Sequence, residues 1–486
     1  MQSRYYKVWI IGLTVLVSAC SVTPELVVPD IALGSYYLSD NQHYPVVEED
    51  GDNWWKQFDD PLLDQLIEQA QSQNITLQVA AERVKAARAY QAAVSSLKVP
   101  TVSVGVSYTG MGLSENESLG GIAVTPLPLP NGGSIQLLDE QHTNTLFGLG
   151  IAWEADLFGR MDALSAAAEV RAEQAALLKE GLLIAMTGDV IDNYLQMRGA
   201  QQRQVIVAES IEDQQRAIRL IESLVDHGIA AELDLVRAKA MLASTQAILP
   251  LLESAEVIHQ QRLAILTSDN SDEFLMSLAE VKAVPAFKGG IPVGLPSELL
   301  QRRPDIRVAE LEMLAANHEL GAAIAAGYPR FYLSGTPGLA ASDFSDLFKS
   351  SSMAWLGSAT VSWNIFDGGR SEALKAVSEA NVNAAVLSYE QAVNIAFSEV
   401  RTLLNAYGNT TVRYDQVLDA QQFGNEALRR ANALYEAGLI DQLTLIDAQR
   451  QQLSLDDQTL NAELQLAQLA VGLYKSLGGD WQVSSQ

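Results

Sequence analysis

Few side chains in this chain of 486 residues could perform chemistry, and they are scattered. No two of the five histidines lie at the spacing of metal ligands, and they occur at His43, His142, His227, His259 and His318. The glycine-containing segment GIAVTPLPLPNGG, residues 121–133, lacks the lysine of a phosphate-binding loop. We therefore expect no enzymatic activity, no metal site and no bound cofactor.

The only cysteine, Cys20, has a specific chemical context. It follows Arg4, Lys7 and an apolar run over residues 8–19, which is too short to span a bilayer and is typical of a secretory signal. The ending LVSAC resembles a lipobox, in which the cysteine is lipidated and becomes the mature N-terminus. The alternative is an ordinary signal peptide and a chance cysteine, but an unpaired thiol would be a liability in an exported protein.

We therefore predict a signal peptide over residues 1–19, a covalent lipid on Cys20 and a lipidated extended segment over residues 20–60. Ser21 after the cysteine, in place of aspartate, resembles the sorting pattern of bacterial outer-membrane lipoproteins. The net charge is −27, and it becomes −29 when Arg4 and Lys7 are removed with the signal. On this charge we expect no nucleic-acid partner. The acidity fits either solubility or an acidic lumen that favours cations.

One motif occurs twice, as WEADLFGR at residues 153–160 and WNIFDGGR at residues 363–370. The same offset of 210 aligns residues 224–238 with residues 434–448, including Gly228 with Gly438. Upstream the offset is 229, so the first copy carries 19 extra residues in a stretch, 105–145, that we expect to form an enlarged surface loop. The sequence predicts two structural repeats, over residues 61–285 and 286–486.

Each copy is mainly helical in prediction, because long stretches lack proline and are rich in Ala, Leu, Gln and Glu. We expect two very long helices at 161–226 and 371–436, return helices at 232–268 and 442–477, and shorter helices at 75–98 and 304–327. Gly228 and Gly438 mark the turns after the long helices, and Pro250 predicts a kink in the first return helix.

Between the short and long helix of each copy, apolar residues alternate with small or polar ones. This pattern predicts strands at 101–108, 146–153, 330–336 and 355–363, with one apolar face suited to lipid. Four strands cannot close a membrane barrel, since the smallest type has about eight, and an open edge in lipid leaves backbone groups unpaired. The chain is therefore expected to oligomerise, and three copies would supply twelve strands.

The chain resembles outer membrane factors of the TolC type, in the OprM/NodT-like lipoprotein branch. Besides the two tryptophan motifs, the resemblance rests on WWKQFDDPLLDQLI (54–67), LPSELLQRRPDIRVAE (295–310), YEAGLIDQLTLIDAQR (435–450) and SLGGDW (476–481). It implies a mainly α, mixed α/β membrane protein: a homotrimer with a twelve-stranded barrel in the bacterial outer membrane and a long α-helical tunnel in the periplasm. It also implies export of small molecules with an inner-membrane efflux transporter and a periplasmic adaptor. We expect Trp54, Trp55 and Phe58 to be core residues beside the tunnel.

The resemblance also implies a gate at the periplasmic tip. Leu443, Asp447 and Arg450 share one helix face, whereas the first copy has Leu233, Arg237 and Ala240 at these positions. The resemblance implies that Leu443 and Asp447 form constriction rings. It further implies that Asp234 and Tyr435, with Arg450, act as latches and that the turns at Gly228 and Gly438 meet the adaptor. A simpler interpretation is a solvated face whose Asp447–Arg450 pair contributes only about 0.2–0.5 kcal/mol.

Two other functions remain open from the sequence. The first is an outer-membrane channel of a type I protein secretion system, which neighbouring transporter genes would distinguish. The second is a purely structural lipoprotein coiled coil, which would not need four amphipathic strands.

Overall fold

The computed structural model describes residues 22–29, 31, 53–114, 124–129, 132–137, 141–290 and 302–479. Cys20 and the predicted signal peptide lie outside these residues. The chain divides into two compact units. One comprises residues 1–28, 86–172 and 312–385, and the other comprises residues 29–85, 173–311 and 386–486. Each unit draws on both sequence copies.

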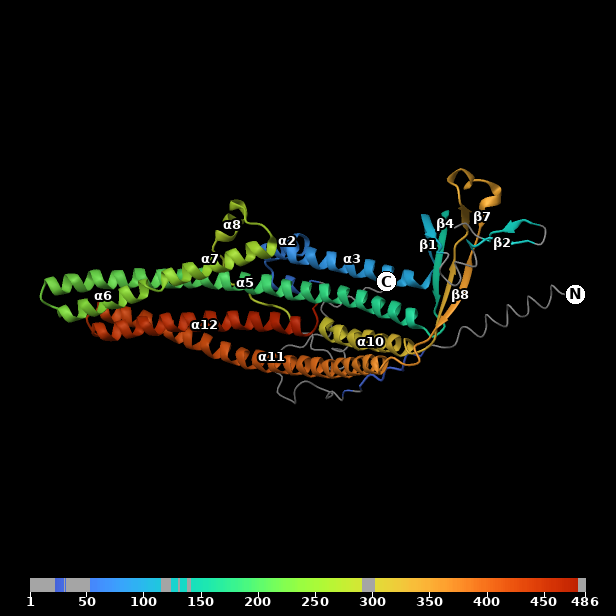
Figure 1. The fold of residues 1–486 in the computed structure, drawn as a ribbon. Coiled ribbons are helices and arrows are strands. Elements are labelled where there is room, and N and C mark those ends of the chain that lie inside the picture. Colours follow the sequence, from blue (N-terminus) through green and yellow to red (C-terminus); the bar gives the residue numbers. More distant parts are fainter. Residues whose placement is uncertain are drawn as a thin grey trace. The chain divides into compact units, whose positions relative to one another are not determined.

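The two longest helices are α5 (Arg160–Asp226) and α11 (Arg370–Glu436), each of 67 residues (Figure 1). Both were predicted to within one residue, because glycine precedes each helix and follows each of them closely. The return helix of the second copy is α12 (Gln442–Ser476). That of the first copy is split into α6 (Glu232–Gln246) and α7 (Leu249–Thr267). Pro250 lies in the first turn of α7, which confirms the predicted interruption.

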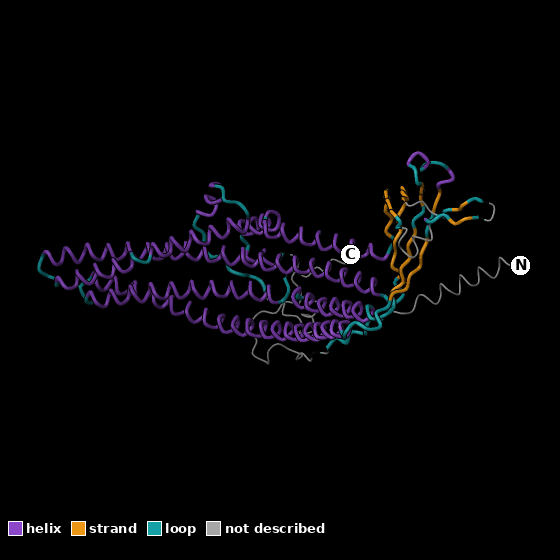
Figure 2. Tube along the Cα trace, viewed as in Figure 1, coloured by secondary structure: helices purple, strands orange, loops and turns teal. Residues whose placement is uncertain are grey.

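The shorter helices are α3 (Ile75–Ser95), continued by a 3-10 turn η2 (Ser96–Lys98), and α10 (Pro304–Ala325). Further helical elements among the described residues are η1 (Trp54–Phe58), α2 (Pro61–Gln73), α8 (Asp272–Ala279) and the short 3-10 helices η4 (Phe344–Asp346) and η5 (Ser350–Ser352). Figure 2 separates these helices from the strands by colour.

An aromatic cluster forms part of the core of the unit that contains most of α5 and α11. Trp54 stacks on Tyr474 with ring centroids 4.3 Å apart, and Phe58 packs against Phe287 at 5.3 Å. Trp54, Trp55 and Phe58 are all buried, which confirms that they are core residues. Arg303, just before α10, joins three helices to this core. Its guanidinium donates to Asp305, to Glu399 of α11 and to the carbonyl of Ser476 at the end of α12.

The six strands of the main sheet occupy four strand positions, as predicted. β1 (Thr101–Gly112) pairs with β4 (Gln141–Ala155). β4 then pairs in one continuous register with β5 (Arg330–Gly335) and β6 (Gly338–Ala341), which Pro337 separates. These pair in turn with β8 (Gly357–Ser362) and β7 (Met353–Ala354). All pairs are antiparallel, and β1 and the β7–β8 position form the two edges.

The loop between the first two strands is shorter than predicted. Residues 105–112 and 141–145 belong to β1 and β4, which pair in one unbroken register as far as Gly112 with Gln141. The glycines and serines there lie within a strand and do not mark a loop: Gly105 and Ser107 are on one face, and Gly110 and Gly112 on the other. Within the remaining connection, β2 (Leu127–Pro128) and β3 (Ser134–Ile135) form a small hairpin.

The sheet has one apolar and one small-residue face. Val104 lies beside Leu149 on the apolar face, where Trp355 is also found and is 80% exposed in the single chain. On the other face Gly105, Gly148, Gly338 and Ala354 form a row across all four strand positions. No side chain larger than a methyl group lies in this row.

Each tryptophan motif ties the end of a strand to the end of a preceding helix. The indole nitrogen of Trp153, at the end of β4, donates to the carbonyl of Lys98 in η2 at 2.9 Å. Trp363 donates to the carbonyl of Gly327, just after α10, at 3.0 Å. Asp156 and Asp367 then accept backbone N–H groups in the first turns of α5 and α11, from Asp162 and Ser371.

Candidate functional site

The turns that end the two long helices have the same backbone geometry. Gly228 and Gly438 both have φ of 71°, a left-handed conformation that glycine adopts without steric cost. The N–H groups of the following residues, Ile229 and Leu439, reach back to the carbonyls of Leu224 and Leu434 at 2.8 and 2.9 Å. This is a Schellman motif in each copy, so both glycines are helix C-caps, as predicted.

Both turns present an apolar side chain to solvent. Ile229 is 73% exposed and Leu439 is 71% exposed, and the 210-residue offset aligns them. Burying such a side chain against a partner contributes about 1.5–3 kcal/mol. The two turns are therefore suited to contact another apolar surface.

The starts of the return helices differ between the copies. Asp441 caps α12, because its Oδ1 accepts the N–H of Thr444 at 2.9 Å and the Thr444 hydroxyl at 2.6 Å. These hydrogen bonds hold the pKa of the Asp441 carboxyl below its usual value. In the first copy the same position is Ala231, whose side chain cannot cap α6. The second turn is thus more firmly built than the first.

Leu443, Asp447 and Arg450 lie together on an exposed face of α12. Another face of the helix is buried and carries Gln442, Leu445 and Gln449. Leu443 is 49% exposed. Asp447 accepts a hydrogen bond from Arg450 at 3.3 Å, and both side chains are largely solvent-accessible. We call these three residues the α12 stripe. The structure places them as the sequence predicted, and their role remains a prediction.

Asp234 and Tyr435 come from different helices and are brought together. Burial raises the pKa of the Tyr435 hydroxyl, and the negative charge of Asp234 adds to this effect. Asp234 lies 4.0 Å from Arg237 on the next turn of α6. The carboxylate of Asp234 therefore lies near an arginine of its own helix and acts electrostatically on Tyr435 of α11.

A small apolar cluster supports this end of the helices. Ile218, Ile221 and Ala238 form its buried centre, and Ile446 of α12, from the second sequence repeat of the same chain, packs against it. Ile446 precedes Asp447, so the cluster fixes the rotation of α12 and turns the α12 stripe outward. Leu235 and Leu242 of α6 complete the packing.

Among the described residues no group of three or more His, Cys, Asp or Glu side chains could hold a metal ion. An apolar residue that lines a passage can block water. A carboxylate one turn further along the helix favours cations when the passage is open. Sequence reasoning missed the exposed Ile229 and Leu439 and the Asp441 cap. The repeat offset and the D-x-x-T spacing were the signals that could have found them.

The model of the family described as outer membrane efflux protein matches residues 66–268 and 295–479 of this sequence. The chain belongs to the outer membrane efflux protein family. This outer membrane efflux protein is 31% identical over 438 residues to the solvent efflux pump outer membrane protein SrpC of Pseudomonas putida, covering 88% of this chain and 87% of SrpC. It is 30% identical to the outer membrane protein OprJ of Pseudomonas aeruginosa, covering 88% of this chain and 86% of OprJ.

Solved structures show the same fold. The outer-membrane channel OprN superposes with a TM-score of 0.85 and 34% identity, over 95% of this chain and 100% of that one. The CmeC outer membrane channel of Campylobacter jejuni also gives 0.85, over 96% of both chains, at 21% identity, which shows the fold alone. The outer membrane efflux protein is therefore a mainly α efflux channel protein of the outer membrane, and its family is one of transport proteins.

Proposed function

We propose that this protein is the exit channel of a tripartite efflux system. Small molecules such as drugs and toxic compounds would pass from an inner-membrane transporter and a periplasmic adaptor through a gated homotrimeric tunnel. The observation that carries the proposal is the open four-stranded sheet, whose apolar face is exposed along its whole width in the single chain. Such a sheet is stable in a membrane only when its edges pair with further strands.

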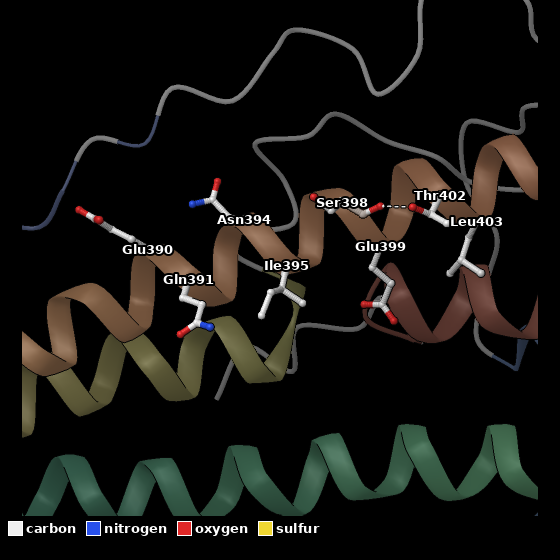
Figure 3. Close-up of a pocket in the computed structure, with 8 residues that line it drawn as sticks. All are labelled: Glu390, Gln391, Asn394, Ile395, Ser398, Glu399, Thr402 and Leu403. Atoms are coloured by element: carbon white, nitrogen blue, oxygen red, sulfur yellow. Dashed lines mark hydrogen bonds between the residues drawn. The ribbon is translucent and has the colours of Figure 1, made fainter.

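Three chains supply twelve strands when β1 of one chain pairs with β8 of the next. The apolar face then meets outer-membrane lipid, and the row of Gly105, Gly148, Gly338 and Ala354 faces the lumen. An exposed groove of about 790 Å³ along α11 supports contact with another copy (Figure 3). Its lining is mainly polar, with Gln391, Asn394 and Thr402 among the polar residues, and Ile395 and Leu403 are its apolar members. A mass of the detergent-purified complex other than that of a trimer would contradict this assembly.

The anchor is proposed to be a lipid on Cys20. A single acyl chain gives marginal membrane binding, and the strands provide the second contact. Metabolic labelling with a palmitate analogue should mark the wild type and not Cys20→Ser. Equal label in both proteins would exclude acylation at this position.

The α12 stripe is proposed to be the periplasmic gate. Leu443 side chains from three copies would seal the passage, and Asp447 carboxylates would set a preference for cations. Carboxylates held close together repel one another and need arginine or cations nearby, which Arg450 supplies. Asp234 and Tyr435 would act as latches between hairpins, because the negative charge of Asp234 already adds to the rise in the pKa of the Tyr435 hydroxyl.

The adaptor is proposed to bind at the two turns. Ile229 and Leu439 offer the apolar contact, and Gly228 and Gly438 fix the backbone that presents them. The substrates are proposed to be small and apolar, because relatives are named for pumps of solvents and toluene. Those names also favour small molecules over protein secretion.

Single-channel recording in a planar bilayer tests the gate. Wild-type protein should show low conductance and cation preference, and Leu443→Ala with Asp447→Ala should raise the conductance several-fold. The matched control is Leu233→Ala with Arg237→Ala, which changes the equivalent positions of the first copy. An unchanged conductance in the first double variant would place the constriction elsewhere. An equal rise in conductance in the control would show that both sequence repeats line the constriction.

A further inference from the structure

The described N-terminal segment, residues 22–28, contacts α10 through a buried side chain. Asn317 is only 5% exposed, and its amide nitrogen donates a hydrogen bond to the carbonyl of Pro24 at 2.9 Å. A buried amide without a partner costs about 1–3 kcal/mol. Pro24 therefore supplies a hydrogen bond that the interior of this unit requires.

A second contact lies one turn further along α10, at Gly321. A side chain at this position would begin 2.2 Å from Oγ1 of Thr23 and 2.8 Å from its Cβ and Cγ2. Real Cβ atoms do not approach other atoms this closely. The helix therefore offers Thr23 a notch that exists because residue 321 is glycine. Asn317 and Gly321 are spaced i and i+4, so the two contacts lie on one face of α10.

The order of the two contacts gives the segment a direction. Pro24 lies at Asn317 and Thr23 lies at Gly321, so from Pro24 back to Thr23 the chain runs toward the C-terminal end of α10. Ala325 ends the helix about 6 Å beyond Gly321. β5 begins shortly after, at Arg330. Cys20 is three positions before Thr23 in the sequence, and chain length limits this span to about 11 Å.

We propose that Asn317 and Gly321 form a docking site for the N-terminal segment that sets where the acyl anchor enters the membrane. The site holds Thr23 and Pro24 on the helix that leads into β5, and so keeps Cys20 within reach of the level at which the strands begin. The lipid part of this inference rests on the acylation of Cys20 proposed above. The docking contact stands without it.

Cleavage at Glu25 by a glutamate-specific protease tests the docking in the detergent-purified complex. Glu25 follows Pro24, and its cleavage releases an N-terminal peptide that mass spectrometry can count. Cleavage at Glu25 requires the segment to leave α10. We expect Asn317→Ala to raise the cleavage rate up to about tenfold, as the loss of one hydrogen bond allows, and Gly321→Val to raise it as well. His318→Ala, one residue along the same helix, is the matched control and should leave the rate unchanged.

A disulfide provides a second measurement if Gly321→Val fails to fold. In Thr23→Cys with Gly321→Cys the two Cβ atoms begin 2.8 Å apart, so the segment has to move outward by about 1 Å to reach the about 3.5–4.5 Å of a disulfide. The expected result is a bond that keeps the Glu25 peptide attached until reduction. Unchanged cleavage in Asn317→Ala, or absence of the disulfide, would overturn the docking. If the disulfide forms and the thiol of Cys20 is found free, the lipid on Cys20 is refuted and the docking stands.

Discussion

The indole nitrogen of Trp363 donates a hydrogen bond to the backbone carbonyl of Gly327 across 3.0 Å. The first copy repeats this bond between Trp153 and Lys98, at the positions that the repeat offsets predict. Each bond connects the end of the second strand of a pair to the segment that precedes the first. The tryptophan motif therefore closes a strand pair at its base, which is why it occurs once for each pair.

Replacing either tryptophan by phenylalanine should loosen the base of one strand pair. The ring is kept and the hydrogen bond is lost, so we expect a destabilisation of roughly 0.5–1.5 kcal/mol for Trp153→Phe and for Trp363→Phe. Thermal unfolding in detergent, followed by circular dichroism in the strand region, measures the effect. Trp355→Phe, on the exposed apolar face, is the control. A loss in the control equal to that in the other two variants would show that ring size, and not the bond, is responsible.

The glycine row offers a matched pair of substitutions. A Cβ atom at Gly338 would come 2.5 Å from the carbonyl oxygen of Phe147 and 2.7 Å from Cα of Gly148, both backbone atoms that cannot move alone. A Cβ atom at Gly105, in the same row, meets nothing within 4 Å. Gly338→Ala should lower the thermal stability of the assembled sheet by several degrees, and Gly105→Ala should not. Equal stability of the two variants would contradict the close approach of β4 and β6.

Asp192 gives a pH-dependent stability that can be measured. Burial raises the pKa of its carboxyl to about 6, with Lys475 opposing and Asp189 adding to the rise. Its Oδ1 has no hydrogen-bond partner among the described residues. Because the folded pKa lies above the unfolded value of about 3.9, ionisation costs stability as pH rises from about 4 to about 6, and the cost is complete above that range.

We therefore expect Asp192→Asn to be more stable than the wild type at pH 8, by about 2–3 kcal/mol, and no more stable at pH 4. Thermal unfolding in detergent at the two pH values measures the difference. The control is Asp189→Asn, which removes an exposed carboxylate that pairs with Lys475 at 3.2 Å. A gain for Asp192→Asn that is the same at both pH values would mean that packing, and not charge, is relieved.

The charge of the α12 stripe should determine ion preference. Asp447→Asn removes the carboxylate and keeps its shape, so the ratio of potassium to chloride permeability should fall toward one in bilayer recordings. Glu436→Gln makes the same charge change at the same turn, off the stripe, and should leave the ratio near that of the wild type. A fall of equal size in both variants would assign the preference to the net charge of the tip and not to Asp447.

The long helices could be predicted closely because local signals mark both ends. Gly-Arg pairs precede them, Gly228 and Gly438 follow, and no proline interrupts them. The alternation of Val102, Val104 and Val106 with small residues likewise identified strand β1. Its full length was missed, because the same glycines and serines that line a strand face are also typical of loops. Only the pairing with β4 distinguishes the two.

The remaining features depend on contacts between residues far apart in the sequence. The burial of Asp192 follows from packing around α5, and its position in the sequence resembles that of any helical aspartate. The need for glycine at position 321 arises from Thr23, nearly three hundred residues earlier. The repeat offset aligns Ile229 with Leu439, but how far each side chain is exposed depends on the backbone of the turns. The α12 stripe was predicted because helical periodicity alone places its residues on one face.

The turns at Gly228 and Gly438 have the same backbone conformation and differ in the side chains around them. In a ring assembled from copies of this chain, hairpins of two kinds must alternate around the axis, one kind with Asp441 and Asp447 and the other with Ala231 and Arg237. A substitution at position 447 then alters every second hairpin and leaves those between them intact. The internal repeat therefore lets the charge of the proposed gate change on one kind of hairpin while the alternate hairpins keep their own sequence.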